Sequence, residues 1–328
     1  MPDAIHSPDD DTMNLLFVAD PVEHFKIYKD TTFSMMREAQ RRGHTVSVCE
    51  PRHIRWQQGS QVLARVRDLH LTGDAQDWYA ATGERQAALS SFGAVLMRKD
   101  PPFDSEYFYA THLLEQAERD GARVFNKPRA LRDHPEKLAI MEFPDLIGPT
   151  LVTRDAQDIR AFHQEHQDVI LKPLDGMGGM GIFRVKADGL NLGSIIETLN
   201  KEGAETVMVQ KFLPEISEGD KRVLIIGGEP VPYCLARIPQ GSEVRGNLAA
   251  GGKGVARALT ERDMEIGRKL GAVLLERGML LAGVDVIGDC VTEINVTSPT
   301  CFQEIHDQTG CDVPALFIDA LEKQLNLR

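Results

Sequence analysis

The sequence lacks several features that would assign it to a specialised class of protein. No apolar run approaches the roughly 20 residues that cross a bilayer, and the longest runs, such as residues 15–19, suit buried strands. Basic residues are fewer than acidic ones, 37 against 49, so the formal net charge is −12. A general nucleic-acid binder would present a basic field instead. The composition therefore predicts no nucleic-acid partner and no membrane partner.

Paired cysteines and the common hydrolase motifs are also missing. The five cysteines are an odd number, and no C-x-x-C pair occurs. We expect reduced thiols in a cytoplasmic protein. Neither G-x-S-x-G nor H-E-x-x-H occurs, so the sequence gives little support to serine or zinc hydrolysis.

The overall composition is typical of a folded globular protein. Hydrophobic residues make up 42% and charged residues 26% of the 328 residues, which is ordinary globular usage and predicts two domains or one large domain with subdomains. Residues 1–12 contain four aspartates and two prolines. They predict a disordered tail without the basic and apolar regions of a signal peptide.

Strand and helix patterns alternate over residues 13–127, which we expect to form an N-terminal α/β domain. Alternation of this kind predicts a parallel sheet with helices on its faces, and such a sheet places its sites at the carboxyl ends of its strands. Residues 98–102 follow one such end. Residues 59–85 give no assignment. The expected strands are 14–19, 45–49, 94–97 and 124–125, and the expected helices are 32–42 and 105–119.

From residue 128 the pattern changes to antiparallel hairpins. We expect a small lobe at 128–215 and a C-terminal lobe at 216–328. The expected hairpins are 169–172 with 182–185, 222–226 with 231–238, and 281–287 with 291–296; a further strand is 207–212, and the helices are 192–200, 261–277 and 313–324.

A glycine-rich segment inside the first hairpin is the strongest local signal for a site. Lys172 ends a buried strand, and Gly176, Gly178, Gly179 and Gly181 follow it closely. Glycines let backbone N–H groups surround an anion, and a lysine adds a point charge. A strand pattern follows the loop, so the dinucleotide fingerprint, which must open a helix, is rejected. The segment predicts a phosphate-binding loop, with an ordinary glycine-rich turn as the alternative.

A second signal is acidic. Asp285 lies on one strand of the last hairpin, and Glu293 and Asn295 point to one face of the other strand. A two-residue turn would pair Asp285 with Thr292, whereas a three-residue loop at 288–290 would pair it with Glu293. We predict the longer loop, because two facing carboxylates need a cation between them. Magnesium suits these oxygen ligands; a solvated polar face is the alternative.

Two further segments predict substrate handling. Lys221, Arg222 and Arg237 lie on neighbouring strands and Arg245 lies in the loop beyond. Such a cluster in an acidic chain suggests an anionic substrate, or else surface ion pairing. Residues 239–254 contain five glycines and few large apolar residues. They predict a mobile lid that excludes water from a reactive intermediate, or else a plain surface loop.

These features occur in motifs that resemble those of the prokaryotic glutathione synthetases, a family of the ATP-grasp superfamily. The resemblance covers nearly all of the chain from about residue 14, in family order. The motifs are 97–104 (MRKDPPFD), 126–133 (NKPRALRD), 172–179 (KPLDGMGG), 219–224 (GDKRVL), 232–239 (PYCLARIP), 245–252 (RGNLAAGG) and 292–300 (TEINVTSPT).

The resemblance implies a parallel-sheet N-terminal domain followed by an ATP-grasp fold of two antiparallel-sheet lobes, with ATP between them. It implies ligation of γ-glutamylcysteine to glycine through an acyl phosphate, giving glutathione, ADP and phosphate, by a cytoplasmic homotetramer that uses Mg²⁺, with Mn²⁺ as an alternative. The implied ATP contacts are Lys137, Lys172, Gly176, Gly178, Gly179, Gln210, Lys211, Phe212, Leu213 and Asp220. The implied metal ligands are Asp285, Glu293 and Asn295. The implied substrate contacts are Arg222 and Arg237, which also orient the reactants for catalysis, and Arg245, Asn295, Ser298, Pro299 and Thr300.

The sequence departs from the family pattern at two positions. Met180 stands where the family's glycine loop often has a small polar residue, and Gln303 stands where an arginine is common. The departure at Gln303 affects one expected contact, either to a substrate carboxylate or to the glycine substrate. Two other functions remain open from the residues alone: a ligase of the same fold that joins another carboxylate and amine, and a non-catalytic ATP-binding module.

Overall fold

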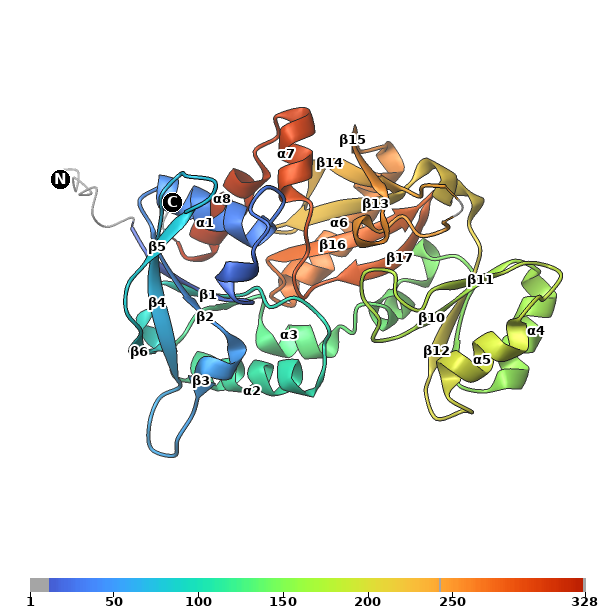
Figure 1. Cartoon of the computed structure of the whole chain (residues 1–328), viewed down its shortest axis with the longest axis horizontal. Coiled ribbons are helices and arrows are strands. Elements are labelled where there is room, and N and C mark those ends of the chain that lie inside the picture. Colours follow the sequence, from blue (N-terminus) through green and yellow to red (C-terminus); the bar gives the residue numbers. More distant parts are fainter. Residues whose placement is uncertain (1–11, 242, 327–328) are drawn as a thin grey trace.

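The computed structural model describes residues 12–241 and 243–326 and arranges them around three β-sheets (Figure 1). The predicted disordered tail lies, except for Thr12, outside the described residues. One sheet belongs to the first part of the chain, and the other two follow it in sequence. The predicted fold class, a parallel-containing sheet followed by antiparallel sheets, is confirmed.

The first sheet has the strand order β3-β4-β2-β1-β7-β8. Its four predicted strands are confirmed as mutually parallel neighbours: β1 (Asn14–Val18), β2 (Thr45–Cys49), β7 (Ala94–Met97) and β8 (Val124–Phe125). Residues 59–85, which had no sequence assignment, contribute antiparallel strands to this sheet. In β4 the apolar residues are buried, and polar or charged residues between them are more exposed. The added strands are β3 (Ile54–Arg55), β4 (Leu63–Leu71), β5 (Tyr79–Ala81) and β6 (Arg85–Ala88).

Aspartates start the two long helices of this part. Asp30 accepts a hydrogen bond from Phe33 N and begins α1 (Thr31–Arg41). Asp104 accepts one from Tyr107 N and begins α2 (Ser105–Arg119). Both are N-caps that satisfy otherwise unpaired backbone donors. A short helix, α3 (Pro128–Asp133), then leads away from the first sheet.

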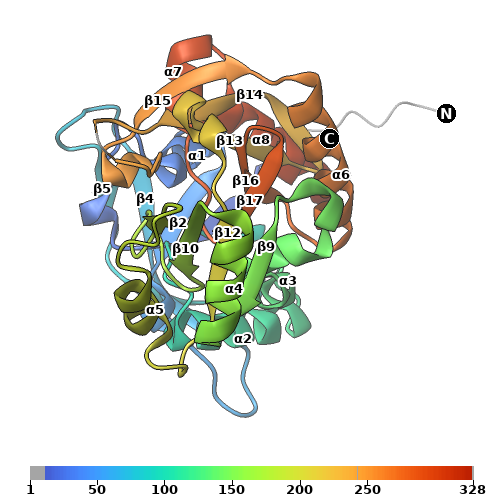
Figure 2. The same ribbon diagram turned by 90° about the vertical axis from the view of Figure 1, so that its right-hand side faces the viewer.

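The second sheet is antiparallel, with the order β11-β10-β12-β9. The predicted hairpin around the glycine loop is confirmed as the β10–β11 pair. Two helices cover one face of this sheet (Figure 2). The elements are β9 (Thr150–Thr153), α4 (Ala156–His166), β10 (Val169–Pro173), β11 (Phe183–Val185), α5 (Leu192–Asn200) and β12 (Val207–Lys211).

The third sheet is also antiparallel, with the order β15-β14-β13-β16-β17, and it contains the other two predicted hairpins. The edge strand β15 was not predicted, and its first two residues, Lys253 and Gly254, are the last two residues of the expected lid. The elements are β13 (Asp220–Ile226), β14 (Glu229–Ile238), β15 (Lys253–Ala258), α6 (Glu261–Glu276), β16 (Leu281–Ile287) and β17 (Cys290–Asn295).

The last helices return to the first part of the chain. α7 (Phe302–Thr309) and α8 (Val313–Gln324) lie beside α1 (Figure 1). Arg42, after α1, donates to the Asp319 and Glu322 carboxylates at 2.6 and 3.0 Å. Short 3-10 turns occur at Val22–His24, Pro51–His53, Leu89–Ser91, Leu138–Glu142, Pro144–Leu146, Pro214–Glu218 and Leu248–Ala250.

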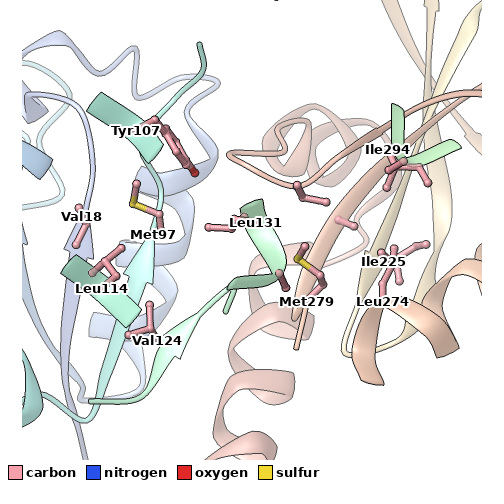
Figure 3. Close-up of a cluster of buried hydrophobic side chains, with 14 of the residues drawn as sticks. Val18, Met97, Tyr107, Leu114, Val124, Leu131, Ile225, Leu274, Met279 and Ile294 are labelled. Atoms are coloured by element: carbon pink, nitrogen blue, oxygen red, sulfur yellow. The ribbon is translucent and has the colours of Figure 1, made fainter. Parts of the chain in front are cut away.

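A continuous hydrophobic core joins the first sheet to the third (Figure 3). Val18, Met97 and Leu114 lie on the side of the first sheet, Ile225 and Leu274 on the side of the third, and α3 stands between them. Burial of this apolar surface holds the two sheets together. The domain boundaries near residues 127 and 215 remain a proposal.

Candidate active site

A pocket lies between the second and third sheets. Every predicted nucleotide contact except Gly178 lines it, and so do Arg245, Asp285 and Glu293. The lining residues are Lys137, Gly148, Pro149, Ile170, Lys172, Gly176, Gly179, Met180, Ile182, Gln210, Lys211, Phe212, Leu213, Ile216, Asp220, Val244, Arg245, Gly246, Asn247, Asp285, Ile287, Val291, Thr292 and Glu293.

Two lysines meet in this pocket from different elements. Lys172, at the end of β10, is buried, and its Nζ donates to the Thr292 carbonyl of β17 at 3.1 Å. Lys137 Nζ donates to the Gly176 carbonyl at 2.5 Å and lies 3.1 Å from Glu293 Oε1. Burial lowers the pKa of Lys172, with the neighbouring Lys137 adding to this effect against the pull of Glu293. Two close ammonium groups with one adjacent carboxylate favour a polyanionic ligand.

The glycine loop lies against the predicted lid. Arg245 Nη1 donates to the Gly179 carbonyl at 3.1 Å. Gly179 has a φ of +83°, which favours glycine, and a Cβ there would lie 2.7 Å from Asn247 Oδ1, so a larger residue would have to displace the Asn247 side chain. A Cβ at Gly178 would instead meet Ala249 of the lid at 3.5 Å, and Gly178 does not line the pocket. Met180, one of the two departures from the family pattern, lines the pocket and is 61% exposed.

Asp285 is paired with Glu293 across β16 and β17, as predicted, but the predicted loop is wrong. Ile287 pairs with Cys290, so the loop has two residues, and an irregularity in register follows at Thr292. A β-bulge of this kind puts two residues of one strand opposite one of the other. The extra residue restores the pairing that a two-residue turn alone would have prevented.

Two of the predicted arginines, Arg222 and Arg237, form a buried ion network behind the pocket, so the alternative of surface ion pairing is wrong for them. Arg222 Nε donates to Asp285 Oδ1 at 2.5 Å. Arg237 Nη2 lies 2.6 Å from Asp220 Oδ2 and 2.9 Å from Asp285 Oδ2. All four side chains are buried. Burial opposes ionisation of Asp285, but the two guanidinium groups outweigh it and hold its pKa below the ordinary range.

Asp220 differs from Asp285 within the same network. Burial raises its pKa, and repulsion from Asp285 adds to the rise, although Arg237 opposes both. Its Oδ1 atom is buried without a hydrogen-bond partner among the described residues. Asp220 also lines the pocket. An unpaired buried oxygen at a pocket wall fits a hydroxyl donor on a ligand. Lys221, next in the chain, points away from the network and contacts Asp263.

Asn295 and the predicted substrate contacts of the turn 298–300 do not line the pocket. Asn295 Nδ2 donates to the Gly283 carbonyl at 3.1 Å. Ser298 Oγ donates to the Arg98 carbonyl at 3.4 Å, and the Pro299 carbonyl accepts from Arg98 Nη2 at 3.0 Å. Thr300 Oγ1 lies 3.7 Å from Cys301 Sγ. The turn 298–300 therefore connects the third sheet to the first.

The predicted metal ligands fit a hard divalent cation by their chemistry. Asp285, Glu293 and Asn295 offer carboxylate and amide oxygens, and the Asn295 amide nitrogen already donates to Gly283, which leaves its oxygen as the ligand atom. Within residues 12–241 and 243–326, no three His, Cys, Asp or Glu side chains gather into a metal-binding group. The set is therefore two carboxylates completed by an amide and, for magnesium, by substrate oxygens and water.

Sequence reasoning missed the apolar wall of the pocket. Ile170 lies two residues before Lys172 on β10, and residues two apart on a strand generally share a face, so this spacing was a signal. Val291 on β17 gave no such signal, because the bulge at Thr292 separates it from Glu293. Gln210 pairs with Ile170 across β10 and β12 and extends the wall. Apolar walls suit the flat base of a nucleotide.

Gln303, the other departure from the family pattern, is buried at the start of α7. Its Oε1 accepts from Arg37 Nη2 of α1 at 3.1 Å, and its Nε2 donates to Asp307 at 2.6 Å. Arg37 of α1 thus places a positive charge beside Gln303, the position where the family commonly has an arginine.

Two family models match consecutive parts of the chain. The N-terminal domain of prokaryotic glutathione synthetase matches residues 13–132, and the ATP-grasp domain of the same family matches residues 136–310. Within the described part of the chain, no helix combines the length and the apolar character needed to span a bilayer.

Relatives named glutathione synthetase are similar over nearly their whole length. The protein of Ralstonia nicotianae is 60% identical over 311 residues, which cover 95% of this chain and 96% of the relative. The protein of Nitrosomonas europaea is 55% identical (95% and 98% covered), and that of Vibrio parahaemolyticus is 50% identical (95% and 99%).

Solved structures share the fold at low sequence identity. D-cycloserine synthetase DcsG superposes with a TM-score of 0.67 at 16% identity, covering 95% of this chain and all of the other chain. The ATP-grasp ligase PsnB in complex with its minimal precursor gives 0.61 at 18% identity, with 95% and 99% covered. Together with the family models and the close relatives, these similarities show that the chain is an ATP-grasp ligase and belongs to the prokaryotic glutathione synthetase family.

Proposed function

We propose that this chain makes glutathione at the pocket between the second and third sheets, where it joins the cysteinyl carboxylate of γ-glutamylcysteine to the amino group of glycine and converts ATP to ADP and phosphate. The observation that carries this proposal is the facing arrangement of Lys137 and Lys172 with Asp285 and Glu293 around one pocket. Relatives with 50–60% identity named glutathione synthetase support the choice of substrates.

The nucleotide is proposed to lie with its base against the apolar wall and its phosphates at the lysines. Gln210, Lys211, Phe212 and Leu213 form one continuous segment of that wall and offer backbone groups to the adenine edge. The unpaired Asp220 Oδ1 would accept a hydrogen bond from a ribose hydroxyl. The glycine loop from Gly176 to Gly179 would cover the phosphates with backbone N–H groups.

The metal is the second part of the proposal. An ATP-grasp glutathione synthetase uses ATP with a divalent metal, and we propose Mg²⁺ held by Asp285, Glu293 and Asn295. When bound, such an ion neutralises charge on the phosphate oxygens. Asp285 keeps its arginine contacts at both oxygens and has further lone pairs for a ligand, because a carboxylate has about four acceptor sites.

The chemistry follows from the weakness of a carboxylate as an electrophile. A carboxylate oxygen of the dipeptide attacks the γ-phosphorus, the bond from this phosphorus to the β–γ bridging oxygen breaks, and ADP leaves. Lys137 and Lys172 neutralise the charge that is shared among the transferring oxygens. The glycine nitrogen then attacks the acyl carbon, the C–O bond to phosphate breaks with its electron pair, and the ammonium proton passes to the leaving phosphate or to solvent.

Orientation and exclusion of water complete the proposed mechanism. Arg222 and Arg237 hold Asp285 in place, so their proposed contribution is positioning of the groups around the reactants. Arg245 joins the lid to the glycine loop through Gly179. A closed lid would keep water from the acyl phosphate. The Ser298-Pro299-Thr300 turn is proposed to contact the peptide, since a Cβ placed at Gly283 would meet both Arg222 Cδ at 2.8 Å and Pro299 Cβ at 3.1 Å.

Assembly and location belong to the proposal as well. We expect a homotetramer, which light scattering of the purified protein would detect as about four times the 36.4 kDa chain mass. The five cysteines are free in the structure, in keeping with a reducing compartment such as the cytoplasm.

Phosphate release tests the function directly. The protein should release phosphate from ATP only when both γ-glutamylcysteine and glycine are present, and glutathione should form in equal amount. Release that needs a different acid or amine would favour a ligase of the same fold with other substrates. Binding of ATP without any amine-dependent release would favour a non-catalytic ATP-binding module.

A further inference from the structure

An arginine–aspartate pair on the second sheet contacts one residue of the pocket wall. Asp168 directly precedes β10, and Arg184 lies on β11. Arg184 Nε donates to Asp168 Oδ1 at 2.9 Å, and Arg184 Nη2 donates to Asp168 Oδ2 at 2.6 Å. Two hydrogen bonds from one guanidinium group to one carboxylate fix the plane of that group. Neither residue lines the pocket itself.

The guanidinium group of Arg184 lies over the ring of Phe212, which does line the pocket. Arg184 Cζ is 3.4 Å from the centre of this ring. Asp168 holds the backbone of the same residue, because its carbonyl accepts from Phe212 N at 2.9 Å. Phe212 is therefore held at its ring by Arg184 and at its backbone by Asp168, and these two residues are bonded to each other.

The strand register places this contact on the pocket face of the sheet. Arg184 pairs with Ile170 across β11 and β10, and Ile170 pairs with Gln210 across β10 and β12. Both Ile170 and Gln210 line the pocket. Val169 and Leu171 point to the other face, where they pack with the helices α4 and α5. Directly paired residues on neighbouring strands share a face, so Arg184 stands beside the wall of the pocket.

The pair lies away from the proposed phosphate contact on the same strand. Asp168 and Lys172 are four positions apart along an extended segment, which corresponds to about 13 Å. The pair is also neutral as a unit, since the Asp168 carboxylate balances the charge of Arg184. A neutral pair against an aromatic ring suits the base of a nucleotide, whereas the phosphates need the unbalanced charge of the lysines.

The wall segment beside Phe212 has a free backbone donor. Lys211 N donates to the Pro149 carbonyl at 3.0 Å, and Phe212 N is used by Asp168. In the part of the chain that the structure describes, no group accepts from Leu213 N. A free N–H favours adenine, whose N1 accepts a hydrogen bond, over hypoxanthine, whose N1 carries a hydrogen. This choice requires a wall segment that stays in place, because a loose segment would adapt to either base.

From these observations we propose that Asp168 and Arg184 are positioning residues for the base of the nucleotide. By holding Phe212 they keep the wall segment 210–213 in the geometry that selects adenine. A ring already fixed by its neighbours loses little further freedom when a base binds, so the pair also strengthens nucleotide binding. This inference rests on the nucleotide orientation given in the proposed function, but not on the acid and amine substrates.

Binding of ADP and of IDP, measured by isothermal titration calorimetry, tests the pair without any turnover. IDP differs from ADP only at the base, where N1–H and a carbonyl oxygen replace N1 and an amino group. The unmodified protein should bind ADP at least ~10-fold more tightly than IDP. Arg184→Met should weaken ADP binding about tenfold and remove most of the preference over IDP. Asp168→Asn should act in the same direction.

Turnover separates positioning from damage to the fold. In Arg184→Met the KM for ATP should rise while kcat at saturating ATP stays within about twofold. A merely structural role would lower kcat and leave the KM and the base preference unchanged. Arg85→Met is the matched control, because Arg85 donates to both oxygens of Asp68 at 3.0 and 2.8 Å and lies 5.8 Å from the centre of the Phe92 ring, in the first part of the chain. This control should keep ADP affinity and the preference over IDP.

The possible outcomes decide between the two levels of the argument. Unchanged ADP affinity and base preference in Arg184→Met and Asp168→Asn would overturn the inference, as would an unmodified protein that binds IDP as tightly as ADP. If Arg184→Met does not fold, Asp168→Asn alone decides. A protein that selects ADP through this pair but releases no phosphate with γ-glutamylcysteine and glycine would overturn the proposed function and leave this inference standing.

Discussion

Asp285 and Glu293 face each other across β16 and β17 because the bulge at Thr292 compensates for a loop of only two residues. The same bulge presents the Thr292 carbonyl to Lys172, which donates to it at 3.1 Å. One irregularity in one strand therefore sets the positions of two carboxylates and a phosphate-facing lysine. Bulges often occur beside active sites for this reason, since they redirect side chains within a rigid sheet.

Glu293→Gln should lower turnover by roughly 100-fold or more, because it removes a charged metal ligand while keeping the shape of the pocket wall. Phosphate release in the presence of both substrates measures this effect. Asp289→Asn, in the adjacent turn and exposed, is the matched control and should retain full turnover. Equal turnover in the two variants would remove Glu293 from the catalytic site.

Asp285→Asn should destabilise the protein by about 3 kcal/mol or more, because it leaves two buried guanidinium groups with too little negative charge. Glu265→Gln, which breaks the exposed pair with Arg262, should cost less than about 1 kcal/mol. Urea unfolding at neutral pH measures both. The pKa of Asp285 is depressed in the folded state, so its contribution is present above its unfolded pKa and is lost as the pH falls toward its folded pKa. Asp285→Asn should therefore flatten the acid side of the stability curve.

Gly179→Ala should weaken ATP use through the contact between loop and lid. The new Cβ would lie 2.7 Å from Asn247 Oδ1, so the lid should close poorly, the KM for ATP should rise, and phosphate should be released without product. Gly73→Ala is a close control, because Gly73 has the same φ of +83° but nothing within 4 Å of its Cβ position. Both changes should cost about 1 kcal/mol in backbone strain. A similar loss of coupling in both variants would exclude the lid contact as its cause.

Lys172 should set an alkaline limit on ATP use. Burial lowers its pKa, so kcat/KM for ATP should fall as the pH rises through a value below that of a free lysine. The free energy of unfolding responds to pH in the opposite direction. Between the lowered pKa of Lys172 in the folded protein and its ordinary pKa in the unfolded chain, the unfolded chain binds more protons, so stability rises with pH. Lys172→Arg should move the alkaline limit upward, because arginine stays protonated. The exposed Lys186, replaced by Arg in the same way, should leave the profile unchanged.

The sequence by itself determined the elements and most of the residue types in the site. Short apolar or alternating runs predicted β1, β2, β7 and β10 within one or two residues, and β1, β2 and β7 are buried on both faces. Helical patterns predicted α1, α2 and α6 equally well, because each helix buries one stripe. The glycines after Lys172 and the carboxylates of the last hairpin also follow from local chemistry. The strand β4 could not be predicted, since its charged outer residues conceal the buried ones.

Tertiary structure decided how those residues act together. The burial of Arg222 and Arg237 with Asp285 and Asp220 depends on the pairing of β13 with both β14 and β16. The exposed or buried state of an arginine depends on which strands flank it, and no pattern within its own strand records this. The contacts of Arg98 likewise need the end of β7, the start of α1 and the distant turn 298–300 in one place, since its side chain donates to Thr32 Oγ1 and to the Pro299 carbonyl. Local patterns report which face of an element is apolar, whereas contacts between residues about 200 positions apart arise only when the whole core packs.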